Sequence, residues 1–261
     1  MRALSIASTG MMAQQMNVEV ISNNIANLNT TGFKRARAEF SDLMYQAQRR
    51  PGVPSADTGE VTPSGIQLGL GVKPAAISRV HSQGNLTQTE NELDIAIQGR
   101  GYLVVETPDN EQGYTRAGAL QRSAEGELVT LEGYRILPGI QVPDNAKSVT
   151  INRTGEVFAD IDGQTEPQAL GQVEIAVFVN EAGLEAVGDN LFKETEASGI
   201  PLLGTPGQPG FGILRQGYVE SSNVNVVQEI TSLIAAQRAY EMNSKVVETG
   251  DQMLSRVSQM R

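Results

Sequence analysis

The chain has 261 residues, no cysteine and a formal net charge of −10 at pH 7, with a sequence pI near 4.7. A chain of this length buries a substantial core without requiring two separate folded domains. The acidic balance argues against binding to phosphate backbones, and the absence of cysteine excludes disulfides, thiolate zinc sites and a cysteine nucleophile.

The first predicted element is a helical segment over residues 1–32 with apolar residues every seven positions. One row holds Leu4, Met11, Val18 and Ile25, and a second row, three residues further on, includes Ile21 and Leu28. Rows with this spacing keep one seam of a helix turned towards a partner helix. Between residues 3 and 32 the only charged side chain is Glu19, whereas a solitary surface helix normally has a charged outer face.

The end of this helix is expected near residues 27–32, where Gly32 supplies a left-handed cap. The segment lacks the basic start, unbroken apolar run and cleavage site of a secretory signal, so another export route is expected if the protein leaves the cytoplasm. No stretch of the sequence is long and apolar enough to predict a membrane-spanning helix.

Residues 33–74 are predicted to form an extended connector. Proline and glycine are frequent between residues 51 and 74, so neither a helix nor a regular central strand is expected there. The residues that mark this connector are Tyr45, Pro51, Pro54, Pro63, Gly65 and Gly69.

A central β domain is predicted over residues 75–217. Short strand-like runs at 93–97, 102–106, 127–131, 148–151 and 173–179 are separated by turn signals, and no alternating βαβ pattern appears. Residues 199–217 are again rich in glycine and proline and are expected to form an irregular return path. The predicted fold class is therefore α+β, with a mainly antiparallel β domain inserted between terminal helices.

A second helical segment is predicted over residues 218–261, regular from Val226 to the end. Its apolar residues are Val226, Ile230, Leu233, Tyr240, Val247 and Leu254. The two terminal segments are expected to pair as a coiled-coil-like stalk. They would either complete each other within one molecule or present further faces to other chains, and the nearly uncharged first helix favours further chains.

Two other functions are compatible with parts of the sequence. Membrane-surface helices set lysine and arginine against the apolar face, and that cationic face is missing here. Alternate carboxylates at Glu90, Glu92 and Asp94 would share one face of a strand and favour metal binding or acid–base chemistry, although such alternation is more typical of a solvated strand face. His81, the only histidine, has no nucleophile motif to act with, so no catalytic residue, cofactor or metal is expected.

Several motifs resemble those of the axial proteins of the bacterial flagellum, the rod and hook family. The N-terminal match is SNNIANLNTTGFK at residues 22–34, and the C-terminal matches are SSNVN at 221–225, AQRAYE at 236–241 and NSK at 243–245. Further matches are HSQGNL at 81–86, LDIAI at 93–97 and TRAG at 115–118. Within the family, the chain length and the connector, LMYQ at 43–46 through PSGIQLG at 63–69, are most similar to subunits of the rigid distal rod.

The resemblance implies a structural subunit of the distal rod in the extracytoplasmic basal body, which polymerises into a helical tube and transmits motor torque to the hook. Its implied partners are further copies of itself, the proximal-rod and hook-side axial proteins, the bushing rings and the flagellar export apparatus, with no nucleic acid and no membrane insertion. It also implies that the connector stiffens the tube. A hook or proximal-rod subunit is the alternative within the family, and a peptidoglycan hydrolase or a glycan-binding β module is the alternative from other classes.

Overall fold

The computed structural model describes residues 2–49, 64–108, 111–162 and 166–259 and divides the chain into two compact units. Unit 1 holds residues 1–25, 36–78 and 225–261, and unit 2 holds residues 26–35 and 79–224. The chain therefore passes between the units four times. These divisions lie at other places than the predicted boundaries after residues 32, 74 and 217, because residues 26–35 and 218–224 pack with the strands of unit 2.

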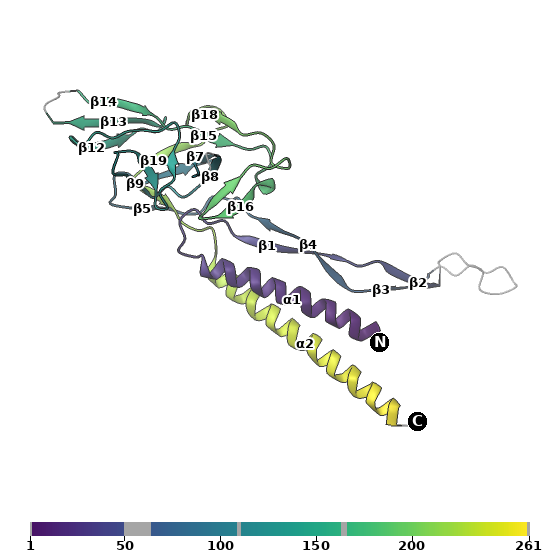
Figure 1. The fold of residues 1–261 in the computed structure, drawn as a ribbon. Coiled ribbons are helices and arrows are strands. Elements are labelled where there is room, and N and C mark those ends of the chain that lie inside the picture. Colours follow the sequence, from purple (N-terminus) through teal and green to yellow (C-terminus); the bar gives the residue numbers. More distant parts are fainter. Residues whose placement is uncertain (1, 50–63, 109–110, 163–165, 260–261) are drawn as a thin grey trace. The chain divides into compact units, whose positions relative to one another are not determined.

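The two long helices, α1 (Arg2–Ala26) and α2 (Val226–Gln259), belong to unit 1 and run antiparallel to each other (Figure 1). Both were predicted, and α2 begins at the predicted residue. Its N-terminus is capped by Asn225, whose Oδ1 accepts a hydrogen bond from the Gln228 N–H at 3.2 Å. In the described part of the chain, no helix has the length and hydropathy that a membrane span requires.

The predicted end of the first helix was wrong in one respect. The helix ends at Ala26, and Gly32, with a φ of +72°, lies six residues later, inside unit 2. A Cβ at Gly32 would lie 2.7 Å from the backbone nitrogen of Ala117. Glycine is therefore required there because its φ is positive and the backbone closely approaches the segment that follows β8, and it is not the cap of the helix.

Unit 1 also contains two β ribbons. In one ribbon β1 (Ala36–Asp42) pairs with β4 (Val72–Arg79), and in the other β2 (Tyr45–Arg49) pairs with β3 (Ile66–Gly69). The last part of residues 51–74 forms β3 and the start of β4, but neither is a central strand, the kind of strand that the proline and glycine content argued against. A strand of a two-stranded ribbon has one free edge, so Pro74 occupies β4 without removing a hydrogen bond from a sheet interior.

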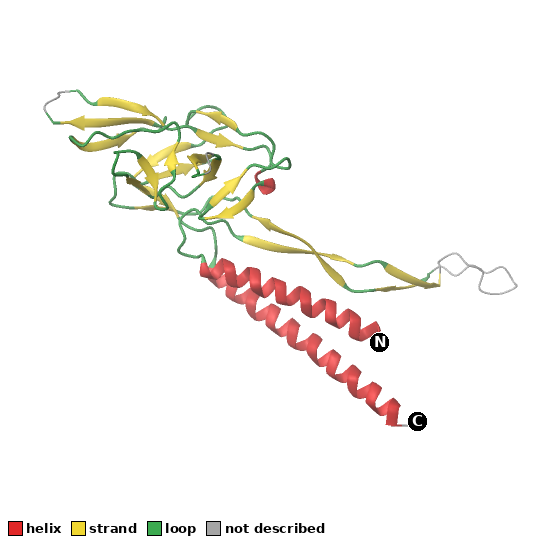
Figure 2. Ribbon diagram, in the orientation of Figure 1, coloured by secondary structure: helices red, strands yellow, loops and turns green. Residues whose placement is uncertain are grey.

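Unit 2 is built from short antiparallel strands, as predicted (Figure 2). Its largest sheet has nine strands in the order β16-β17-β8-β7-β11-β10-β9, with β15 pairing with β7 and β18 with β15. These strands are β7 (Tyr102–Glu106), β8 (Gln112–Thr115), β9 (Leu120–Arg122), β10 (Leu128–Thr130), β11 (Arg135–Ile136), β15 (Ile175–Val177), β16 (Glu185–Gly188), β17 (Leu191–Lys193) and β18 (Leu202–Gly204).

The remaining strands of unit 2 form smaller sheets. A three-stranded sheet contains β12 (Ala146–Ile151), β13 (Glu156–Ile161) and β14 (Gln168–Gln172), and two-stranded pairs are formed by β19 (Ile213–Gln216) with β6 (Ile95–Gln98) and by β20 (Tyr218–Glu220) with β5 (Leu86–Gln88). A 3-10 turn, η1, spans Glu181–Gly183. The expectation of an irregular path over 199–217 was wrong, because β18 and β19 pair with distant strands that the local glycine and proline content does not reveal.

Strand β7 divides the hydrophobic core of unit 2 into two clusters. Its successive side chains point to opposite faces, so Leu103 and Val105 join the larger cluster while Tyr102 and Val104 join the smaller one. All four are at most 2% exposed, which explains why the run is apolar without alternation. Among the described residues, both clusters consist entirely of side chains from unit 2.

Candidate assembly interface

The two helices of unit 1 meet through small and polar residues. Nδ2 of Asn24 on α1 donates to Oε2 of Glu229 on α2 at 3.2 Å, and both side chains are buried. A methyl group at Gly10 would lie 2.9 Å from Nδ2 of Asn243, and one at Gly250 would lie 2.7 Å from Cδ2 of Leu4. Glycine therefore permits the close approach of the helices at two levels of this seam.

Asn24 also holds the start of β1 against the helix. Its Oδ1 accepts from the Ala36 N–H at 2.9 Å, and its Nδ2 donates to the Ala36 carbonyl oxygen at 2.8 Å. One side chain thus bonds to both backbone groups of Ala36 and to Glu229. Because an unpaired buried polar group is costly, this arrangement favours a single register of α1, α2 and β1.

The predicted apolar rows lie beside this seam. Ile21 is buried, while Leu4, Met11, Val18, Ile25, Leu28, Val226, Leu233 and Val247 are half-buried, and Ile230, Tyr240 and Leu254 are exposed. Leu28 lies in the turn that follows α1 and belongs to unit 2. The seam row on α2 is instead Glu229, Ala236, Asn243 and Gly250. The large apolar residues of the sequence did not reveal this row, although its members are also spaced seven residues apart.

A large amount of apolar surface remains exposed on unit 1. On the helices it comprises Ile6, Met12, Val227, Ile230, Ile234, Tyr240, Met242, Val246, Met253 and Leu254, and on the ribbons Met44, Tyr45, Ile66, Leu68, Leu70 and Ile77. Val227 is 75% exposed and Met44 is 82% exposed. Exposed apolar side chains in this number make unit 1 a candidate for contact with other protein, and we define these residues as the assembly surface.

The connector residues that the structure describes lie in the second ribbon. Tyr45 of β2 is 59% exposed and is the register partner of Gly69 in β3. A methyl group at Gly69 would make ordinary contact with the Tyr45 ring, at 3.4 Å from Cε1. Gly65 directly precedes β3. Pro51, Pro54 and Pro63 lie outside the described residues.

The premise of the catalytic alternative was wrong. Residues 90–94 form a bend and a turn rather than a strand, so Glu90, Glu92 and Asp94 do not share a strand face. The Asp94 carboxylate is buried and accepts from Nδ2 of Asn91 at 2.8 Å. Asparagine bonds within a turn compete with strand pairing, which explains the local structure. Over the ranges that the structure describes, no group of three or more metal-binding side chains occurs.

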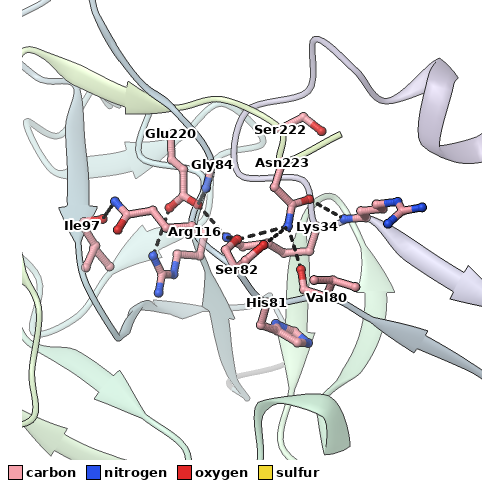
Figure 3. Close-up of polar contacts among 12 residues, drawn as sticks. Lys34, Val80, His81, Ser82, Gly84, Ile97, Arg116, Glu220, Ser222 and Asn223 are labelled. Atoms are coloured by element: carbon pink, nitrogen blue, oxygen red, sulfur yellow. Dashed lines mark hydrogen bonds and ion pairs between the residues drawn. The ribbon is translucent and has the colours of Figure 1, made fainter. Parts of the chain in front are cut away.

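Unit 2 contains a buried polar cluster that the sequence did not predict (Figure 3). Nζ of Lys34 lies 2.5 Å from Oε1 of Glu220, and NH1 of Arg116 lies 3.0 Å from Oε2 of the same carboxylate. All three side chains are at most 3% exposed. Burial lowers the pKa of Lys34, and the Glu220 carboxylate opposes that shift.

The cluster also binds backbone groups around it. Nζ of Lys34 donates to the Ser82 carbonyl oxygen at 2.9 Å, and Oε1 of Glu220 accepts from the Gly84 N–H at 2.8 Å. Arg116 NH2 donates to the Gly99 carbonyl oxygen at 2.8 Å. These bonds use most of the donors and acceptors that burial removes from water, as a buried ion pair requires.

Asn223 extends this network. Its Oδ1 accepts from the Arg35 N–H at 2.7 Å, and its Nδ2 donates to the carbonyl oxygens of Val80 at 2.7 Å and Ser82 at 3.1 Å (Figure 3). We define Lys34, Arg116, Glu220 and Asn223 as the junction cluster. Its members are separated by up to 189 positions in the sequence, so no local pattern reveals it.

His81 lies near the junction cluster. Its Nδ1 is 2.8 Å from the Tyr102 hydroxyl, and its ring makes an edge contact with Phe192. Burial lowers the pKa of His81 to about 4, although Glu181 opposes the shift. The ring is therefore neutral at neutral pH and acts as part of the packing of unit 2.

Comparison with known proteins identifies the family. Three family models match: "Flagella basal body rod protein" at residues 4–34, "Flagellar hook protein FlgE/F/G D1 domain" at 96–159 and "Flagellar basal body rod FlgEFG protein C-terminal" at 215–260. The flagellar basal-body rod protein FlgG of Caulobacter vibrioides is 55% identical over 261 residues, covering 100% of both chains. The chain belongs to the flagellar rod and hook family.

The likeness extends to more distant relatives in this family. FlgG of Agrobacterium fabrum is 54% identical over 99% of this chain and 98% of its own length, and FlgG of Bacillus subtilis is 37% identical over 100% and 99%. Each of the three matched segments contributes to the junction cluster: Lys34 lies in the first, Arg116 in the second, and Glu220 and Asn223 in the third. The cluster therefore joins all three family segments of one chain.

Proposed function

We propose that this protein is a structural subunit of the distal rod of the bacterial flagellar basal body. Many copies polymerise into a rigid helical tube that transmits motor torque across the cell envelope to the hook. The observation that carries the proposal is the assembly surface of unit 1, in a chain that matches rod proteins along its full length.

Burial of the assembly surface supplies the driving force for polymerisation. Moving a large apolar side chain from water into a packed interface contributes about 1.5–3 kcal/mol. Repeated contacts of one kind, joined head to tail, generate an open helix when the rotation does not close into a ring. The terminal helices then pack as a coiled-coil-like inner tube, with the predicted apolar rows turned towards neighbouring copies.

The proposed partners follow from this position. The tube continues from the proximal-rod proteins, is followed by hook-side axial proteins, and rotates within bushing rings. The subunit reaches its site through the flagellar export apparatus, largely unfolded. It has no catalytic role, and the carboxylates at Glu90, Glu92 and Asp94 do not argue for one, because their turn does not align them.

A stiffening role is proposed for the connector, whose described part contains the second ribbon and whose residues 50–63 lie outside the described ranges. We propose that residues 46–70 wedge between neighbouring subunits and resist bending, which is consistent with the exposed apolar side chains of Ile66 and Leu68 on β3. Deleting this segment is expected to give a more flexible, curved polymer. Straight filaments of unchanged stiffness in electron micrographs would contradict this role.

The substitution Leu233→Asp tests the proposed function. Leu233 is half-buried on α2, and a carboxylate buried there in an interface without a partner costs several kcal/mol per subunit contact. We expect no tubes and no motility, with the β strands of unit 2 still folded by circular dichroism. Leu233→Met is the matched control, because it keeps the apolar volume and should polymerise. Normal rods formed by Leu233→Asp would contradict the proposal.

A further inference from the structure

We propose that the junction cluster is a mechanical clamp that ties three of the four passages between the units into one rigid body. The passages lie at residues 25/26, 35/36, 78/79 and 224/225. At the last three passages, the residue on the unit 2 side is Arg35, Arg79 and Val224, respectively. All the contacts that form the clamp lie within unit 2.

The side chain of Asn223 joins these three strands. It accepts from the Arg35 N–H at 2.7 Å and donates to the Val80 carbonyl oxygen at 2.7 Å. The Val80 N–H in turn donates to the Arg35 carbonyl oxygen at 2.8 Å. Each strand is therefore bonded to the other two within one residue of the position where it leaves unit 2.

The carboxylate of Glu220 forms a second layer of the clamp. It binds Lys34 from the segment before the second passage, the Gly84 N–H from the segment after the third, and Arg116 from the sheet region. The Gly32 N–H also donates to the Glu220 backbone carbonyl oxygen at 2.7 Å. The clamp is thereby anchored to the β strands as well as closed on itself.

The chemistry of the cluster fits a positioning role better than a role in stability alone. Apolar side chains of the same volume often stabilise a core as well as a buried ion pair does. Charge-assisted hydrogen bonds have in addition a defined direction and length, so sliding one strand against another leaves a buried charge unpaired. This resists relative movement of the three strands.

The need for such a device rests on the proposed function, because a rod subunit experiences torque. Force that reaches one unit passes to the other through the covalent passages. The pairing of β1 with β4 already joins the passages at 35/36 and 78/79. Asn223 and Glu220 add the passage at 224/225, so that three passages move together. The clamp is then a determinant of rod stiffness that is separate from the surfaces that drive polymerisation.

Hydrogen exchange on the full-length subunit tests the clamp directly. With Asn223→Ala, the amides of Arg35 and Val80 are expected to exchange about tenfold faster, because each loses a bond or its support. The amides of Leu103 and Thr115, paired in β7 and β8, should keep their rates. Asn85→Ala, at an exposed asparagine beside the cluster, is the matched control and should change neither set.

Asn223→Asp is the second variant and keeps the size of the side chain. It retains the acceptor for the Arg35 N–H and loses the donor to Val80, so protection of the Arg35 amide should return while the Val80 segment stays loose. Equal acceleration of all amides in unit 2, or no acceleration at Arg35 and Val80 in Asn223→Ala, would overturn the clamp.

Cells that carry Asn223→Ala separate the clamp from the proposed function. We expect basal bodies in normal number, normal swimming at low viscosity and a loss of speed at high viscosity that Asn85→Ala does not show. An identical response to viscosity would overturn the mechanical role, and so would a failure to form rods. The proposed function is judged independently by the tubes formed with Leu233→Met and lost with Leu233→Asp.

Discussion

The two units bury their apolar residues in different ways. Unit 2 encloses both hydrophobic clusters, with Leu128, Ile136 and Ile175 fully buried. Unit 1 buries mainly alanines and a few larger residues, such as Val20 and Ile21, while Val227, Met242 and Met253 remain at least 60% exposed. Unit 2 thus has a core of its own, whereas unit 1 leaves much of its apolar surface exposed.

This difference separates folding from assembly in one chain. A core that is closed within the subunit contributes to stability at any protein concentration, whereas a surface that is covered only by neighbours contributes in proportion to their binding. Substitutions in unit 2 should therefore alter the free energy of unfolding, and those on the assembly surface should alter the concentration at which polymers form.

The largest expected contrast is between Leu128→Ala and Val227→Ala. Leu128 is 0% exposed and Val227 is 75% exposed. We expect Leu128→Ala to reduce the free energy of unfolding of unit 2 by about 2–5 kcal/mol. Val227→Ala should change the stability of the dilute subunit by less than about 0.5 kcal/mol. Urea denaturation of both variants measures the difference.

Val227→Ala should instead raise the critical concentration for polymerisation, by about tenfold for each 1.4 kcal/mol of contact energy lost. Sedimentation of polymers over a range of protein concentrations measures this value. If Val227→Ala destabilised the dilute subunit as much as Leu128→Ala does, the contrast between the units would fail.

A smaller effect is expected at the helix seam. Asn24→Ala removes the bonds to Ala36 and leaves Glu229 buried without this partner, which should cost about 1–3 kcal/mol of local stability in unit 1. Ser22→Ala, at an exposed position on the same helix, is the control. Hydrogen exchange at the Ala36 amide should accelerate only in Asn24→Ala, and an unchanged rate would argue against a register role for Asn24.

The smallest effect is the pH dependence of unit 2. His81 has a pKa of about 4 in the folded state, below its ordinary value of 6.5, because burial disfavours the charged ring. Its stabilising contribution is therefore complete above about pH 6.5, declines as the pH falls from 6.5 to 4, and is absent below 4. With partial exposure of the ring, we expect about 1–2 kcal/mol.

The variant His81→Gln isolates this contribution. It keeps a polar partner for the Tyr102 hydroxyl without a group that titrates in this range. As the pH falls from 6.5 to 4, the unfolding free energy of the wild type should decrease relative to that of the variant. A constant difference over that range would show that the ring does not titrate as described.

Seven-residue spacing was sufficient to predict both helices, and the run Tyr102 to Glu106 was sufficient to predict β7, because these patterns are local. Pairings between distant segments were out of reach. Gly32 looked like a helix cap because its close approach to Ala117 depends on the fold. The buried role of Lys34 was not predicted because its partner, Glu220, lies 186 positions away. The seam row of Glu229, Ala236, Asn243 and Gly250 was missed because its residues are small or polar.

Hydrogen exchange of the dilute subunit and of the assembled polymer tests most directly whether unit 1 is completed only by other copies. In the dilute subunit, amides of α1 and α2 should exchange much faster than those of β7 and β8, and in the polymer the helices should become as protected as the strands. Helix amides as slow as those of β7 in the dilute subunit, and unchanged on assembly, would contradict this account.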